Sequence, residues 1–285
     1  MEARGFGGTI LRIFRLWRLY AMLDVMVATR SLKECVLWMI SDAILNIAAV
    51  TGMLLLAVRF AGIGHWTKNQ VIYMLGYATV VSGTVAVFFS YNVVFISRRL
   101  GRGQFDHTLI QPQPIWMSLL TEGFSPVFGL PMLLPGVGLL LWAISRLPLV
   151  LTPVWLALLL LNLAASCAIV MAFQYLWGSL AFWAPRAAEE INSSSMHFMD
   201  QLKQYPLDGL GTALSSGLLT ILPVGFAGWY PCRALLGLDT TAWGVWMTPL
   251  AALALCALAG MIFQRGMRHY GRTGSQRYSS FGHRG

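Results

Sequence analysis

Side chains with the potential for acid–base chemistry are few and widely separated. His197 and Asp200 form an HxxD pair, and Glu122, Glu189 and Glu190 are the remaining candidates. No nucleophile accompanies the HxxD pair in its polar stretch, and an isolated pair of this kind is most often incidental. We therefore expect no catalytic site. The carboxylates leave open one alternative, a membrane-embedded enzyme that acts on lipid.

Two motifs that would indicate ATP or metal chemistry are absent. A phosphate-binding GxxxxGK[ST] loop needs a lysine directly after a glycine, whereas the three lysines follow Leu32, Thr67 and Leu202. The sequence has neither an HExxH motif nor clustered Cys and His residues. We expect no cofactor in this chain. The cysteines show no CxxC spacing, so we expect free thiols at Cys35, Cys167, Cys232 and Cys256.

Composition indicates an integral membrane protein. Of 285 residues, 57% are hydrophobic and 11% are charged, with a mean hydropathy of +0.65. Soluble domains carry about 25% charged residues. The net charge of +9 is not gathered in one patch. It falls at the ends of apolar stretches, where Lys and Arg orient a chain and contact anionic lipid headgroups. This distribution argues against nucleic acid as a partner.

Hydropathy predicts an all-α domain with six transmembrane helices, over about 36–58, 71–96, 118–144, 153–183, 207–226 and 242–263. Residues 6–34 place arginines opposite an apolar arc, which is typical of a helix lying in the membrane interface. Residues 184–205 predict a second amphipathic helix, begun by Pro185 and lying on the cytoplasmic surface. We expect one domain over 1–264 and a basic, disordered cytoplasmic tail over 265–285.

The distribution of basic residues predicts both termini in the cytoplasm. Of the 20 Lys and Arg residues, only four fall in predicted outer segments: Arg59, Lys68, Arg146 and Arg233. This asymmetry follows the positive-inside rule in every pair of loops.

Four polar residues within the predicted spans are candidates for a translocation path or for contacts between helices. Asp42 and Asn46 lie four residues apart in the first span, and Asn162 and Gln174 share one face of the fourth. For both pairs a structural role is favoured over a role in translocation. Asp42 lies near the cytoplasmic end of its span, and amides commonly form hydrogen bonds within a bundle.

The most informative stretch is the polar segment, residues 97–117 (SRRLGRGQFDHTLIQPQPIWM), between the second and third spans. Gly101 and Gly103 interrupt a helix arriving from upstream, and Pro112 and Pro114 delay the next one. Residues 104–110 are long enough for about two helical turns. A short basic helix between spans fits a docking element, although most basic loops only set topology.

This segment resembles that of the permease subunits of ATP-binding-cassette exporters of the ABC-2 type, in a bacterial branch with six spans. The resemblance covers nearly the whole chain and is strongest over residues 99–106, followed by Leu109 and Pro112. Residues 180–183, 205–207, 222–237 and 278–280 add to it. Gln111 departs from the pattern, because a basic residue is expected there.

The resemblance implies half of a transporter in the bacterial cytoplasmic membrane. Two permease chains, identical or sister subunits, would enclose a path for an amphipathic or hydrophobic substrate. Two copies of a separate ATPase would bind ATP and Mg²⁺ and contact the interfacial helix and the polar segment. The region between the fifth and sixth spans would carry short re-entrant helices. The ATPase-coupling role then falls on Arg98, Arg99, Gly103, Phe105, Asp106, His107, Leu109 and Pro112.

Two further hypotheses follow from that role. Asp106 would accept a charge-assisted hydrogen bond from the ATPase, and Phe105 would fill a pocket in it. Besides the lipid-modifying enzyme, a membrane assembly factor that transports nothing remains an alternative.

Overall fold

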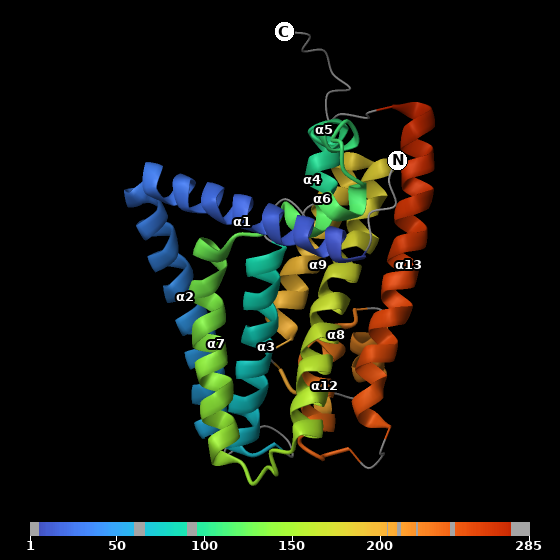
Figure 1. Ribbon diagram of the computed structural model, residues 1–285. Coiled ribbons are helices and arrows are strands. Elements are labelled where there is room, and N and C mark those ends of the chain that lie inside the picture. The colour runs from blue at the N-terminus through green and yellow to red at the C-terminus, as the bar shows by residue number, and fades with distance from the viewer. Residues whose placement is uncertain are drawn as a thin grey trace.

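The computed structural model describes residues 6–59, 66–89, 96–203, 205–209, 212–220, 222–239 and 243–274. Every regular element within these residues is helical, and none is a strand, which confirms the all-α prediction. The long helices run side by side along one axis of the molecule (Figure 1).

Four helices among the described residues are long and apolar enough to cross a membrane. They are α3 (Lys68–Phe88), α7 (Pro126–Arg146), α8 (Pro153–Gly178), which η1 (Ser179–Phe182) extends, and α13 (Gly244–Thr273). The protein is therefore a membrane protein. Because α13 continues to Thr273, residues 265–273 are helical and not disordered as expected from the sequence. Residues 275–285 of the predicted tail lie outside the described residues.

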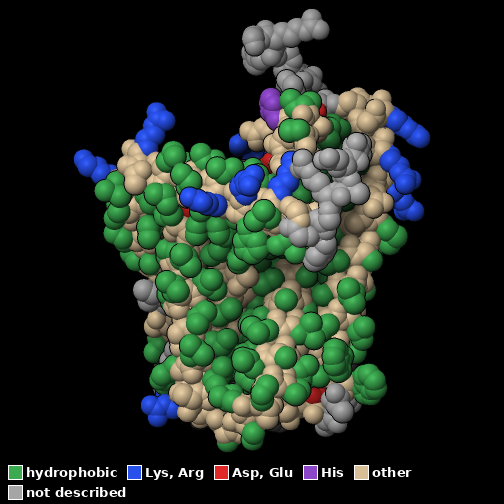
Figure 2. Space-filling view, viewed as in Figure 1, with side chains coloured by type: hydrophobic (Ala, Val, Ile, Leu, Met, Phe, Trp, Pro, Cys, Tyr) green, Lys and Arg blue, Asp and Glu red, His purple; other side chains and the backbone are tan. Residues whose placement is uncertain are grey.

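Helix α1 (Phe6–Arg30) lies across one end of the bundle, nearly at right angles to the long helices (Figure 1). It ends at Arg30, and α2 (Leu32–Arg59) starts two residues later. The same end holds α4 (Ile96–Gly101), α5 (Phe105–Leu109), α6 (Ile115–Thr121) and the last turns of α13. Figure 2 shows Lys and Arg gathered here above a broad hydrophobic surface, and we call it the basic end.

Helix α9 (Pro185–Leu202) starts at Pro185 and is amphipathic, as predicted, with one buried face and one exposed face. Asn192 donates to the Ser97 hydroxyl (3.1 Å) near the basic end. From there α9 runs back beside α8, and Met199 is fully buried in the main core. The buried face thus packs α9 against α8, and the cytoplasmic position expected for residues 184–205 stays a prediction.

The inner end of α9 reaches the middle of the bundle. The backbone of Lys203 contacts Gly228, where a side chain has no room, and Gly228 lies against Ala78, midway along α3. Five residues later, Asp208 accepts hydrogen bonds from Trp66, which precedes α3, and from Trp229. The chain between residues 192 and 208 thus passes from the basic end to the opposite end.

The predicted fifth span, 207–226, is not one helix. The structure has η2 (Leu207–Gly209), α10 (Thr212–Thr220), α11 (Val224–Ala227) and α12 (Trp229–Leu235). Gly, Ser and Pro are frequent here, and they favour breaks over a continuous helix. The predicted third span, 118–144, is covered by two separate helices, α6 and α7, which meet at residues 122–125.

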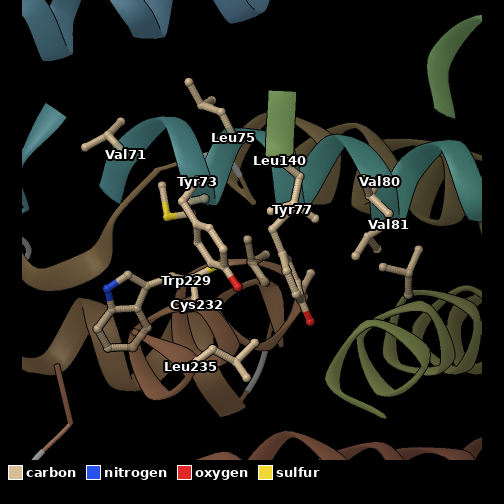
Figure 3. Close-up of a cluster of buried hydrophobic side chains, with 14 of the residues drawn as sticks. Val71, Tyr73, Leu75, Tyr77, Val80, Val81, Leu140, Trp229, Cys232 and Leu235 are labelled. Atoms are coloured by element: carbon tan, nitrogen blue, oxygen red, sulfur yellow. The ribbon is translucent and has the colours of Figure 1, made fainter. Parts of the chain in front are cut away.

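The main core lies where α3 meets α8 and the short helices α11 and α12. In Figure 3 the rings of Tyr73 and Tyr77 extend from α3 toward α12, beside Trp229 and Cys232. The Tyr77 hydroxyl shares a hydrogen bond with Ser166 of α8 (3.0 Å). The short helices therefore pack as part of the bundle and not as a surface loop.

Helices α3 and α7 have the most extensive contact among the described helices, and they interlock through glycines on both sides. A Cβ atom at Gly76 or Gly83 of α3 would collide with the backbone of α7 at Leu140 or Leu133. Gly136 of α7 faces α3 in the same way, with the backbone nitrogen of Val80 at 2.9 Å from a Cβ position. Close backbone approach through small residues is a typical way to stabilise helix pairs in membranes.

We expect Gly136→Ala to destabilise this pair, because the added methyl group must push the α3 backbone away. The cost should be about 1–3 kcal/mol, as for overpacking in a core. Gly138 is a matched control, since a Cβ there meets nothing within 4 Å. Thermal unfolding in detergent should show a lower midpoint for Gly136→Ala alone. Equal midpoints for the two variants would contradict the interlocked packing.

Candidate functional site: a locked polar segment at the basic end

The polar segment folds into a compact unit made of α4, a tight turn, α5 and the first turn of α6. Gly103 has φ of 70°, the left-handed conformation that ends α4. The backbone nitrogen of Gln104 donates to the Arg99 carbonyl (2.9 Å), which completes a glycine C-cap. The predicted short helix, residues 104–110, is confirmed as α5. Pro112 lies in the exposed loop before α6.

A buried ion pair joins Arg99 of α4 to Glu122, the residue that follows α6. Their closest atoms, Nη2 and Oε2, are 2.8 Å apart, and the side chains are only 12% and 8% exposed. Arg99 also donates to the Thr108 hydroxyl of α5 (2.8 Å). Gln111 donates its amide to the other oxygen of Glu122 (3.0 Å). Gln111 thus supports this pair as a neutral donor, although the family pattern predicts a basic residue there.

Phe105 anchors α5 to the rest of the protein. Its ring is fully buried and makes edge-on contacts with Phe182, Phe263 and Tyr270, at centroid distances of 5.9–6.3 Å. Edge-to-face packing of this kind adds to the stabilisation from burial. The hypothesis that Phe105 fills a pocket in a partner is therefore wrong for this conformation, because the ring occupies a pocket in its own chain.

Two further contacts join the polar segment to distant parts of the chain. The carboxylate of Asp106 accepts a hydrogen bond from the Tyr270 hydroxyl near the end of α13. Arg98 forms an ion pair with Glu189 of α9 (3.0 Å), and both side chains are about one-third exposed. The predicted bond from Asp106 to an ATPase stays a prediction, since this carboxylate is only partly buried.

The face of the segment that remains open is small and mixed in character. His107 and Pro112 are exposed, Leu109 is 39% exposed, and Ile110 is 80% exposed. Arg102 adds a positive charge beside them. The predicted coupling residues thus divide into a buried group that shapes the segment and an exposed group that is available for contact.

Helix α1 is attached to the same region by Trp17 and Asp24, which are not among the predicted site residues. The Trp17 ring stacks on Phe124 at 5.6 Å and contacts Phe88. Asp24 accepts hydrogen bonds from the Ser125 hydroxyl (2.8 Å) and the backbone nitrogen of Val127 (2.7 Å). A carboxylate at this position satisfies the free N–H groups of the α7 N-terminus and interacts with the helix dipole.

Tyr20 shows how closely α1 approaches the buried ion pair. Partial burial raises the pKa of its phenol, the Glu122 carboxylate raises that pKa further, and Arg99 opposes the shift. The interfacial helix, the polar segment and the start of α7 therefore form one connected structure.

Comparison with known families identifies this architecture. A family model described as "ABC-2 family transporter protein" matches residues 43–274. The chain belongs to this family. No curated protein and no solved structure matched it. The match includes all four apolar helices and the whole polar segment, so it confirms the resemblance that was drawn from residues 99–112.

The four polar residues predicted within the spans of this ABC-2 family chain do not belong to the polar segment. Asn162 is fully buried in α8 and donates to the Val245 carbonyl at the start of α13 (3.1 Å). Gln174 is also fully buried, without a hydrogen-bond partner among the described residues. Asp42 and Asn46 lie one turn apart on α2, but their side chains are outside the described part. Asn162 thus joins two helices, in agreement with the structural role that was favoured for it.

Metal-ligating clusters are absent from the part of the ABC-2 family chain that the structure describes. No group of three or more His, Cys, Asp or Glu residues gathers there in a way that could hold an ion. The four cysteines are free.

We expect Asp24→Ala to weaken the attachment of α1 to α7. The substitution removes a charged cap that holds two donors, and such caps are worth about 1–2 kcal/mol. Glu34→Ala, at an exposed acidic position in the first turn of α2, is the control. Thermal unfolding in detergent should separate the two variants. A midpoint for Asp24→Ala equal to that of the control would show that the cap contributes little.

Proposed function

We propose that this protein is the permease subunit of an ATP-binding-cassette exporter, driven by a separate ATPase chain that binds ATP and Mg²⁺. The observation that carries the proposal is the family match over residues 43–274, which includes a folded polar segment at the basic end. The chain itself acts as a passive, non-catalytic gate for an amphipathic substrate.

We propose six crossings, made by α2, α3, α7, α8, the segment from α9 to η2, and α13, with both termini in the cytoplasm of a bacterial cell. The positive charges of α1 and of the last turns of α13 support a cytoplasmic basic end. Lys68, Arg146 and Arg233 lie toward the opposite end, where Asn69 donates to the Arg146 carbonyl. Helices α10 to α12 would then form the re-entrant region, which enters from the outside.

Two permease chains, identical or sister subunits, would pair, and two ATPase copies would dock below them. The docking surface is the exposed part of the polar segment, with Leu109 and Ile110 as its apolar centre and Arg102 and His107 at its rim. A movement of α5 reaches α13 through Asp106. It reaches α1 and α7 through the buried Arg99–Glu122 pair and through residues 122–125, which lead into α7. Rigid-body tilting of the long helices then opens the path outward.

The alternative of a lipid-modifying enzyme receives no support from the candidate carboxylates. Glu122 and Glu189 are both held in ion pairs with arginines. The other alternative, an assembly factor, differs from an exporter permease in that it would bind partners without ATP-dependent flux.

The test is copurification of an ATPase with tagged protein from native membranes, followed by ATP-dependent transport in vesicles. Ile110→Asp should abolish copurification, because it places a charge at the centre of the proposed docking surface. Val150→Asp is the matched control, since Val150 is 79% exposed, much like Ile110, but lies in the loop after α7 at the opposite end. Full transport by the isolated chain without an ATPase would reject the proposal.

A further inference from the structure

Helix α9 has a polar exposed face, flanked by the exposed side chains of Ile191 and Phe198, although its inner end reaches the middle of the bundle. Its buried face holds Ala188, Asn192, Ser195 and Met199, spaced as one side of a helix. The opposite face is exposed and carries Glu190, Ser193, Ser194, His197, Asp200 and Gln201. His197 and Gln201 share a hydrogen bond between their side-chain nitrogens (2.8 Å).

The position of this face along the bundle axis follows from Lys203, the residue directly after α9. Lys203 contacts Gly228, which lies against the midpoint of α3. Asp200 and Gln201 are two or three residues before it, so they lie close to that level, given a rise of about 1.5 Å per residue. Side chains of this kind do not face hydrocarbon at such depth, because their desolvation is costly. The face must therefore border water or another polar surface.

One charged pair dominates the deep part of the face. Lys203 Nζ lies 2.5 Å from Asp200 Oδ1, but the lysine is only 4% exposed, whereas Asp200 is 47% exposed. The positive partner is thus enclosed by the protein, and the negative partner is presented outward. An ionised carboxylate accepts about four hydrogen bonds, and Lys203 is the one described residue that bonds it. Asp200 therefore retains acceptor capacity on its open side.

We propose that Asp200 binds a cationic, hydrogen-bond-donating group of the cargo, such as an amine or a guanidine, within a water-filled path lined by α9. The inference rests on the proposed permease function and specifies its substrate class. A cation approaching from the open side meets the carboxylate before the lysine, so the nearer charge determines the attraction. An anion meets the same carboxylate and is repelled.

The test measures the reaction rates of a cysteine beside Asp200 with methanethiosulfonates of opposite charge, in permeabilised native membranes. The background variant is Cys256→Ser, because Cys256 is exposed and the other three cysteines are buried. In Gln201→Cys, the trimethylammonium reagent should react about tenfold faster than the sulfonate reagent, as expected for one nearby charge. Spermidine should slow the reaction, whereas glutamate should not.

Adding Asp200→Asn should abolish or reverse this preference, because Lys203 is then the nearest charge. Glu190→Gln, on the same face but about 15 Å away along the helix, should leave it unchanged. Leu253→Cys is the lipid-facing control and should not react, since Leu253 is an exposed apolar residue of α13. A chain in which Gln201→Cys does not react, or reacts equally with both reagents, overturns the cation site.

The labelling experiment is independent of any ATPase, so the two proposals fail separately. A chain that copurifies an ATPase but shows no cation preference retains the permease function and rejects the cation site. If the chain labels as expected but copurifies no ATPase, the exporter function is rejected and the water-exposed cation site is retained.

Discussion

Glu122→Ala is expected to lower the free energy of unfolding by about 3–5 kcal/mol, because it leaves the buried guanidinium of Arg99 without its charged partner. Both side chains are nearly enclosed, and Glu122 holds Arg99 and Gln111 through different oxygens. The loss should be local at first, with the polar segment detached from the start of α7. Thermal unfolding and limited proteolysis within residues 97–117 would measure both effects.

Glu189→Ala is the matched control for this prediction. It removes the partner of Arg98 in an ion pair of similar length, but that pair is about one-third exposed. Exposed pairs contribute about 0–1 kcal/mol, so the control should unfold almost like the wild type. A double variant that makes both Arg99 and Glu122 apolar should recover part of the lost stability. Equal effects of Glu122→Ala and Glu189→Ala would show that burial does not decide the strength of these pairs.

Phe105→Ala is expected to cost about 3–5 kcal/mol, the usual range for removing a fully buried aromatic ring. The ring joins α5 to η1 and α13, so its loss should free α5 from the bundle while the long helices stay assembled. Hydrogen exchange should then become faster in residues 104–110 and remain slow in α3 and α7. Copurification of an ATPase should fall as well, because the docking surface loses its support.

Leu109→Ala tests whether Phe105 acts through folding or through direct contact. Leu109 is 39% exposed on the same short helix. We expect little change in stability but weaker binding of the ATPase. If Phe105→Ala left hydrogen exchange of α5 unchanged and affected binding alone, the anchoring role assigned to the ring would be wrong.

Apolar composition was sufficient to predict the long helices, whereas the packing partners of α9 could not be predicted from it. Continuous apolar runs identify α3, α8 and α13, since such runs have no stable alternative to a buried or membrane helix. Residues 185–202 contain many polar side chains, a pattern that resembles a surface helix. Their partners come from distant parts of the chain, such as Ser97 for Asn192. Hydropathy along the sequence does not contain that information.

The polar segment could be predicted in outline, but its supports could not. Glycine and proline spacing indicated the short helix, and the family resemblance selected Arg99 and Asp106. Tyr270 and Asp24 were missed, because each acts on a residue more than 100 positions away in the sequence. One signal was available for Asp24, which interrupts an otherwise basic and apolar helix.

The length of α13 has a consequence for how a signal could cross the membrane. It is one unbroken helix of 30 residues, about 45 Å long. Asn162 binds the carbonyl of Val245 near one end, and Asp106 binds Tyr270 near the other. A stiff helix of this kind would convert a push at the basic end into displacement at the opposite end, with little lost to bending. Pro249 lies inside the helix one turn from Val245, so any bend in α13 is expected there, near the end opposite the basic end.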